Sequence, residues 1–219
     1  MSGSTREDLQ GLTGNAYDKY GTRNPVSRFL VGRFLGALDG VVRAADPASV
    51  LDVGCGEGIV TERIARLLPG RPVTGVDVED PALQAAWAAR GGPKELAFRT
   101  GSAYRLPFED GAFDVVCAIE VLEHLERPAE AVAELARVAR RALVASTPRE
   151  PLWRAANMAN GRYLRDLGNT PGHINHWSRR GLVRLLSAAG PVEEVRSPLP
   201  WTIARVRLHG LDGRRPAGA

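Results

Sequence analysis

Short apolar runs alternate with helical stretches through most of the chain. Five runs rich in Val, Leu and Ala, each bounded by turn residues, lie at 49–54, 72–78, 95–101, 113–119 and 141–147. Near-continuous apolar runs of this length are typical of strands buried on both faces of a parallel sheet. Between them we expect helices at 59–68, 81–90 and 128–140, the last with apolar residues at helical spacing. This order predicts an α/β fold with a doubly wound sheet.

The amino-terminal part of the chain precedes the first predicted strand. Residues 15–43 have a mostly helical pattern. We therefore predict a helical lid at 1–45, which would cover the strand ends of a main domain at 46–208.

The carboxyl-terminal part begins with an interruption. Residues 148–176 are rich in aromatic residues, Arg, Asn and His, and predict a loop-rich insertion on the substrate side. Trp153, Met158 and Tyr163 are candidates to line an apolar substrate pocket there. The elements expected after it are a helix at 178–189, strands at 192–198 and 201–208, and a disordered tail at 209–219.

A glycine-rich turn follows the first apolar run. In VLDVGCGEG, Gly54, Gly56 and Gly58 connect the predicted strand to the predicted helix. Glycine leaves the backbone accessible to a ligand and permits a positive φ. Asp77 ends the second apolar run, and a carboxylate there can accept hydrogen bonds from both hydroxyls of a ribose. Both features would lie at the carboxyl edge of the sheet, where doubly wound folds bind ligands.

Other glycine-turn ligands fit the sequence less well. A phosphate-binding Walker loop requires a lysine, and neither Lys19 nor Lys94 lies near the turn. Dinucleotide-binding turns favour G-x-G-x-x-G, whereas this chain has G-x-G-x-G. Neither lysine has a tyrosine four residues before it, as a short-chain dehydrogenase would require. The remaining alternative is that the glycines only connect a strand to a helix.

Four ordered segments carry a family resemblance. VLDVGCGEG, VTGVDV, GSAYRLPFEDGAFDVVCAIEVLEHL and ALVASTP resemble the class I S-adenosylmethionine-dependent methyltransferases over residues 48–148. They are most similar to the small-molecule branch that includes the ubiquinone-type O-methyltransferases. The resemblance implies a Rossmann-like seven-stranded sheet, mostly parallel with an antiparallel last strand, and helices on both faces. It also implies S-adenosylmethionine as cofactor, S-adenosylhomocysteine as product and a small-molecule acceptor.

The resemblance also suggests cofactor contacts. The three glycines would approach the methionine part, Asp77 the ribose, and Ser102 with Ala103 the adenine. The family usually has an acid at position 102, so the serine puts the adenine contacts in question. Tyr17, Lys19 and Tyr20 are possible lid contacts, with simple packing of an amphipathic helix as the alternative. The cofactor-site candidates are Asp52, Gly54, Cys55, Gly56, Gly58, Asp77, Val78, Ser102, Ala103, Glu120 and Tyr20.

Methyl transfer is an in-line displacement in which the protein aligns the acceptor and excludes water. A hydroxyl or carbon acceptor must also lose a proton, which requires a base or a metal. The candidate catalytic residues are Glu120, His124, His173 and His176.

The segment after the fourth strand offers a possible metal site. Glu120, Glu123 and His124 would share one face if a helical turn began there, and Glu-x-x-Glu-His resembles a metal-binding pattern of the ubiquinone-type subfamily. We favour the alternative without a metal, in which Glu120 is a pocket wall and the other two brace the next helix. His173 and His176 have an equivalent alternative as solvated or helix-bracing residues.

Charge and composition narrow the other possibilities. The net charge is +4, but residues 140–219 carry 14 Lys and Arg against 5 Asp and Glu. Because the chain has few lysines and no basic runs interleaved with aromatics, this asymmetry argues for arginine-rich composition rather than nucleic-acid binding. The remaining alternatives are an RNA or protein methyltransferase and a non-catalytic cofactor-binding scaffold. Two cysteines, a polar start and no long apolar stretch predict a cytoplasmic protein without a disulfide or a membrane span.

Overall fold

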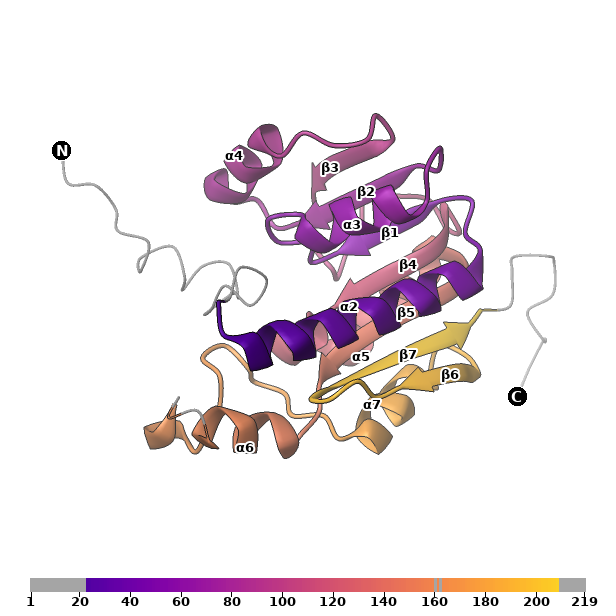
Figure 1. Cartoon of the computed structure of the whole chain (residues 1–219). Helices are drawn as coiled ribbons and strands as arrows, with labels where there is room; N and C mark the ends of the chain where they lie inside the picture. Colours follow the sequence, from indigo (N-terminus) through magenta and orange to yellow (C-terminus); the bar gives the residue numbers. More distant parts are fainter. Residues whose placement is uncertain (1–22, 160, 162, 209–219) are drawn as a thin grey trace, which may run out of the picture.

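A seven-stranded sheet covered by helices forms the framework of the protein in its computed structural model (Figure 1). The structure describes residues 23–159, 161 and 163–208. In chain order the helices, short 3₁₀ helices (η) and strands are α2 (Pro25–Ala45), β1 (Val50–Val53), α3 (Ile59–Leu67), β2 (Val73–Asp77), α4 (Pro81–Ala89), β3 (Leu96–Thr100), β4 (Phe113–Ile119), η1 (Leu122–His124), α5 (Pro128–Val138), β5 (Ala139–Pro148), α6 (Leu152–Ala159), η2 (Leu164–Asp166), α7 (Arg179–Leu186), β6 (Val192–Arg196) and β7 (Trp201–Arg207).

The strand order places the predicted ligand edge beside β1. The strands follow the order β3-β2-β1-β4-β5-β7-β6. β1 to β5 pair in parallel, whereas β7 inserts antiparallel between β5 and β6. This arrangement confirms the predicted sheet with its antiparallel last strand. The order reverses between β1 and β4, which is where doubly wound sheets bind ligands.

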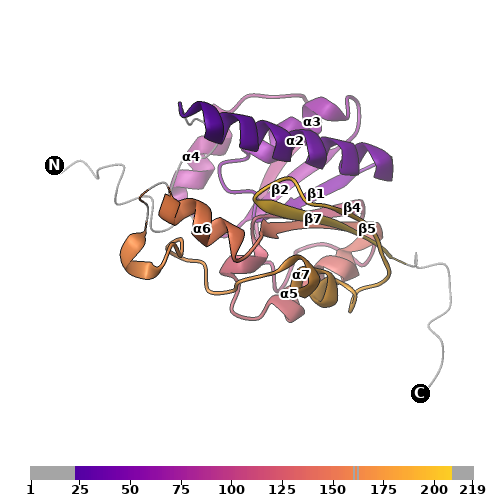
Figure 2. The ribbon, with the colours of Figure 1, turned by 60° about the horizontal axis from the view of Figure 1, so that its bottom comes forward.

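Helices bury both faces of the sheet. α2 and α3 lie on one face, and α5 and α7 lie on the other (Figure 2). Because successive strand residues point to opposite faces, Val50 packs with the first pair of helices and Leu51 with the second. All four residues of β1 are buried, as the continuous apolar run predicted.

Two predicted helix ends are wrong by more than one residue. The helix expected at 178–189 ends at Leu186. The helix expected at 128–140 ends at Val138. Ala139 has an extended backbone, with φ −84° and ψ 133°, and pairs with Phe113 of β4. The apolar spacing of Val138 and Ala139 is compatible with a helix, but strand pairing determines the conformation of Ala139. β5 then continues to Pro148, which lies opposite Trp201 of β7.

The described amino-terminal helix is a layer of the core. α2 begins at Pro25, and the side chain of Asn24 caps it by accepting hydrogen bonds from the amides of Val26 and Ser27. The Phe34 ring of α2 lies 4.9 Å from the Trp201 ring of β7. The lid contacts expected before residue 23 and the tail expected after residue 208 lie outside the described residues, so both stay predictions.

The remaining helices position the insertion. Residues 148–176, expected to be loop-rich, contain α6 and η2, and α6 projects beside the sheet at the end where α2 begins (Figure 2). Within the described ranges, no helix has both the length and the apolar character needed to cross a membrane.

A matched pair of phenylalanines on α2 tests its role as a core layer. Phe34 is 1% exposed and Phe29 is 62% exposed. Phe34→Ala should lower the free energy of unfolding by about 3–5 kcal/mol, because it leaves a cavity against Trp201. Phe29→Ala should change it by less than about 0.5 kcal/mol. Urea unfolding measures both, and equal effects would contradict the core assignment.

Candidate active site

The turn between β1 and α3 can be formed only by glycine at two of its positions. Gly54 and Gly58 have φ values of +72° and +83°. A Cβ on Gly54 would lie 2.4 Å from Cγ2 of Val121, and a Cβ on Gly58 would lie 2.5 Å from Cζ of Phe98. Both the backbone conformation and the surrounding side chains therefore exclude a larger residue.

Asp77 lies directly beside this turn. Its Oδ2 accepts a 2.6 Å hydrogen bond from the Gly56 amide, and its Oδ1 accepts a 2.7 Å bond from the Val78 amide. Burial raises the pKa of the Asp77 carboxyl, the two amide bonds oppose this shift, and the charge of Asp80 adds to it. The predicted proximity of the glycine turn and the acid is confirmed, and the assignment of Asp77 to a ribose stays a prediction.

Two side chains at the end of α4 hold the turn through contacts that the sequence pattern did not predict. Trp87 Nε1 donates a 2.8 Å hydrogen bond to the Gly56 carbonyl, and its ring stacks on Phe98 at 5.3 Å. Arg90 Nε donates to the Glu57 carbonyl at 2.6 Å. The available signal was a tryptophan followed closely by an arginine in an otherwise alanine-rich helix. Nothing in that local pattern indicates that both contact a turn about 30 residues earlier.

Asp52 lies in the buried strand that leads into the turn. It is 1% exposed and accepts a 2.7 Å hydrogen bond from Thr61 Oγ1 on α3. Burial raises the pKa of Asp52 to about 7, the Thr61 bond opposes this shift, and the charge of Asp77 adds to it. Cys55 is half-buried, and burial also raises the pKa of its thiol. The cofactor contacts assigned to these two residues stay predictions.

The next strand end holds the proposed adenine side. The Gly101 amide donates to the Asp77 carbonyl at 2.8 Å, so the ends of β2 and β3 are joined. Ser102 is exposed, and its Oγ accepts a 3.2 Å bond from the Tyr104 amide. Ala103 is partly buried, and Val78 is exposed beside Asp77. The structure thus places these residues at neighbouring strand ends, while their adenine contacts stay predictions.

Glu120 is directed toward the carboxyl-terminal strands. It has a left-handed φ of 61° and precedes the helical turn η1, which starts at Leu122. Its Oε1 accepts a 2.9 Å bond from Ser146 Oγ of β5, and its Oε2 accepts a 2.7 Å bond from Trp201 Nε1 of β7. The helical turn considered for Glu120, Glu123 and His124 therefore contains only the last two.

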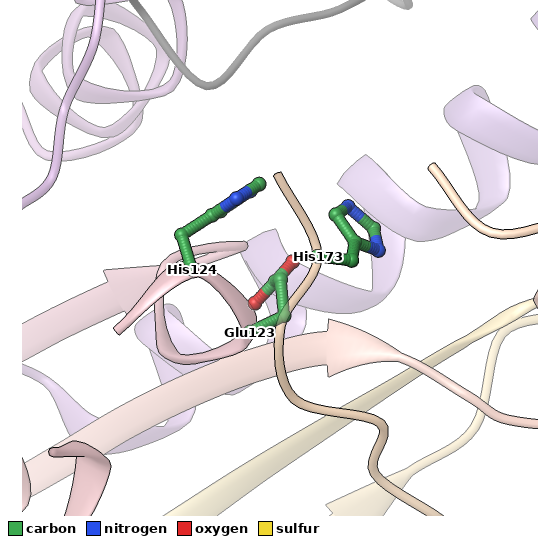
Figure 3. A group of neighbouring side chains, drawn as sticks. All are labelled: Glu123, His124 and His173. Atoms are coloured by element: carbon green, nitrogen blue, oxygen red, sulfur yellow. The ribbon is translucent and has the colours of Figure 1, made fainter. Parts of the chain in front are cut away.

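One carboxylate and two imidazoles meet where η1 approaches the loop before α7. Glu123 and His124 of η1 and His173 of the later loop each offer a ligand atom, all within 4.8 Å of one another (Figure 3). The two imidazole rings lie 4.9 Å apart at 81°. Glu123 is 1% exposed and His173 is 9% exposed. The structure thus brings two of the predicted catalytic histidines together.

Backbone hydrogen bonds hold the two segments in place. The amides of Ile174 and Asn175 both donate to the Glu123 carbonyl at 3.0 Å. Asn175 Nδ2 donates to the Leu125 carbonyl at 2.6 Å. His124 Nδ1 lies 2.9 Å from the Gly172 carbonyl oxygen. The sequence analysis missed Asn175, because its partners lie about 50 residues earlier in the chain.

His176 lies apart from the described group of Glu123, His124 and His173. It is exposed, and its Nε2 lies 2.8 Å from Oδ1 of Asn169. Its catalytic role stays a prediction.

An aromatic wall adjoins His173. The Trp153 ring of α6 lies 6.3 Å from the His173 ring at 24° and 5.5 Å from the Trp201 ring. Trp153 Nε1 donates a 2.8 Å bond to Thr170 Oγ1. Of the other predicted pocket residues, Met158 is exposed, and Tyr163 lies at the start of η2. Tyr17, Lys19 and Tyr20 are outside the described ranges.

Fold and site together define a class of protein. A seven-stranded sheet with an inserted antiparallel strand, a glycine turn after β1 and an aspartate at the end of β2 are features of class I S-adenosylmethionine-dependent methyltransferases. Residues 51–142 match the family described as "Methyltransferase domain". Over these residues the chain is similar to that family.

Similar proteins include enzymes named for different acceptors. The chain is 38% identical over 117 residues to a ubiquinone biosynthesis O-methyltransferase of Alkalilimnicola ehrlichii, covering 52% of this chain and 44% of that protein. It is 33% identical over 95 residues to norajmaline N-methyltransferase of Rauvolfia serpentina, covering 42% of this chain and 32% of that protein. The chain thus spans less than half the length of these curated relatives.

A solved structure has a similar fold. Magnesium protoporphyrin IX methyltransferase from Synechocystis PCC 6803, solved with bound SAH, matches with a TM-score of 0.64 and 20% identity. The match covers 92% of this chain and 97% of that one.

The buried Asp52 carboxyl predicts a pH dependence of stability. Its usual pKa is 3.8, so between pH 5 and 7 the unfolded chain has released a proton that folded Asp52 still holds. Stability from this group is therefore complete below about pH 4 and is lost as the pH rises through about 7. Because Asn cannot ionise, Asp52→Asn should lose about 2 kcal/mol less stability than the wild type between pH 5 and 7.

Urea unfolding at several pH values measures this difference. Glu126→Gln, which removes an exposed carboxylate, serves as the control and should follow the wild type. If the free energy of unfolding of wild type and Asp52→Asn changed with pH in parallel, burial would not raise the pKa of Asp52.

Proposed function

We propose that this protein transfers a methyl group from S-adenosylmethionine to a small-molecule acceptor. The observation that carries the proposal is the hydrogen bond between the Asp77 carboxylate and the Gly56 amide. It places a carboxylate suited to a ribose against a backbone turn that has no room for side chains. The match of residues 51–142 to the methyltransferase domain supports the same cofactor.

The residues of the turn fit this cofactor. Gly54 and Gly58 have no room for a Cβ because Val121 and Phe98 fill that space, and the Gly56 amide between them donates to Asp77 at the end of β2. In this proposal the turn accommodates the methionine part, Asp77 binds the ribose, and Ser102 with Ala103 lies along the adenine. When bound, the cofactor supplies an electrophilic methyl group on a sulfonium.

The acceptor would approach from the insertion. Val121 contacts the glycine turn, and η1 follows it directly, so Glu123 and His124 lie a few residues from the cofactor side. Trp153 supplies a flat apolar surface next to His173. We assign this surface to a cyclic part of the acceptor, and His124 or His173 to removal of its proton. The names of the curated relatives, which include O- and N-methyltransferases, support a small acceptor.

The cofactor assignment predicts a specific loss of binding. Asp77→Asn keeps an oxygen that can accept from the Gly56 amide but removes the charge. It should weaken S-adenosylhomocysteine binding by about 10–100-fold, because charge-assisted hydrogen bonds to the ribose are lost. Glu79→Gln removes an exposed carboxylate two residues away and should leave binding unchanged. Calorimetry measures both, and equal affinity of Asp77→Asn and wild type would overturn the assignment.

The acceptor assignment predicts a change that leaves the cofactor site intact. Trp153→Ala should raise KM at least about 10-fold for whichever phenol or amine is methylated in a panel assayed with labelled S-adenosylmethionine. Affinity for S-adenosylhomocysteine should stay within about 2-fold, because Trp153 does not contact the glycine turn. Leu164→Ala, at an exposed position of the same insertion, is the control. An unchanged KM for Trp153→Ala, or methylation of RNA or protein alone, would refute the proposal.

A further inference from the structure

We propose that Glu123, His124 and His173 form a binding site for one divalent transition-metal cation, of which Zn²⁺ is the type. The three side chains converge from η1 and from the loop after the insertion, with their ligand atoms all within 4.8 Å of one another (Figure 3). The use of this site in methyl transfer rests on the proposed function, whereas cation binding itself does not.

The donor set determines the kind of cation. Two imidazoles and one carboxylate are the protein ligands of many catalytic zinc centres, which keep a further position open. Imidazole donors favour Zn²⁺, Co²⁺ and similar ions, whereas Mg²⁺ and Ca²⁺ prefer oxygen ligands. The site therefore favours a transition metal over Mg²⁺.

The geometry around the three side chains is compatible with metal coordination. A tetrahedral site with bonds of about 2.0–2.2 Å requires ligand atoms about 3.3–3.6 Å apart, so the side chains need to close by about 1 Å. The backbone is already fixed by the hydrogen bonds from Ile174 and Asn175 to the Glu123 carbonyl. The closing movement would therefore fall to the side chains.

Neighbouring groups also orient the imidazoles. His124 Nδ1 lies 2.9 Å from the Gly172 carbonyl oxygen, and a proton on Nδ1 leaves the lone pair on Nε2 available for coordination. A carbonyl partner of this kind is the common outer contact of a metal-binding histidine. The Trp153 ring lies 6.3 Å from the His173 ring at 24° and forms the wall beside it.

The donor set differs from the one that the sequence pattern suggests. Glu-x-x-Glu-His would use Glu120, but the described group of ligand atoms does not contain that residue. The Glu120 carboxylate accepts hydrogen bonds from Ser146 and Trp201, and its backbone is left-handed before η1 starts. His173, which lies 49 residues after His124, takes its place in our proposal. A cation held there would supply Lewis acidity that lowers the pKa of an acceptor hydroxyl, and it would replace the direct proton removal that the proposed function assigns to His124 or His173.

The test measures metal binding by the full-length protein after treatment with a chelator. Titration calorimetry with Zn²⁺ should give one site per chain, Co²⁺ should develop the visible absorption of a nitrogen- and oxygen-ligated ion, and Mg²⁺ should not compete. His173→Ala and Glu123→Gln should each weaken Zn²⁺ binding at least about 100-fold, because each removes a ligand.

Two variants provide matched controls. Glu120→Gln retains side-chain oxygen and size, and His176→Ala removes an exposed histidine three residues from His173. Both should bind Zn²⁺ within about 3-fold of the wild type. If Glu120→Gln weakens binding as much as His173→Ala, the Glu-x-x-Glu-His set is correct and our donor set is wrong.

Binding of S-adenosylhomocysteine to each variant separates the two proposals. Retained binding by His173→Ala would show that the variant is folded, and His173→Gln repeats the test if the alanine variant is not. Failure of the wild type to bind Zn²⁺ or Co²⁺ would overturn the metal site while leaving the methyltransferase proposal intact. Metal binding without affinity for S-adenosylhomocysteine would support the metal site and overturn the methyltransferase proposal.

Discussion

The hydrogen bond from the Gly56 amide to the Asp77 carboxylate is the interaction on which the cofactor side depends. It is possible because β1 and β2 pair in parallel and in register, with Val53 opposite Val76, so that both strands end at the same edge. The amides of Gly54 and Cys55 also donate to the Val76 carbonyl, at 2.7 and 3.1 Å. The turn is therefore attached to β2 through both its backbone and the acid that follows it.

Features determined by local sequence were predictable. Continuous apolar runs predicted β1 and β4 because both faces of these strands are buried, and alternation with helices predicted the parallel order. The turn and Asp77 were predictable together, since parallel strands bring their carboxyl ends to one edge. The end of α5 was not predictable, because the apolar spacing at Val138 and Ala139 fits either a helix or a buried strand. Pairing of Ala139 with β4 determines that the strand forms.

The acceptor side depends on contacts between distant segments, which no local pattern reveals. The conformation of Glu120 is tied to Ser146 and Trp201, which belong to β5 and β7. The position of His173 follows from Asn175, whose side chain bonds to the Leu122 and Leu125 carbonyls. A three-residue spacing would bring Glu120 and Glu123 to one helix face, but η1 contains only Glu123 of the two. It could not indicate that the helical turn begins after Glu120.

The residues proposed for the cofactor and those proposed for the acceptor lie on different segments of the chain. The proposed cofactor contacts come from the β1–α3 turn and the ends of β2 and β3, whereas His173 and Trp153 come from the insertion between β5 and α7. The insertion can therefore change its aromatic and imidazole groups without altering the Gly56–Asp77 contact. Relatives named as O- and N-methyltransferases match this chain over partial lengths, as expected if acceptor chemistry varies on a constant cofactor framework.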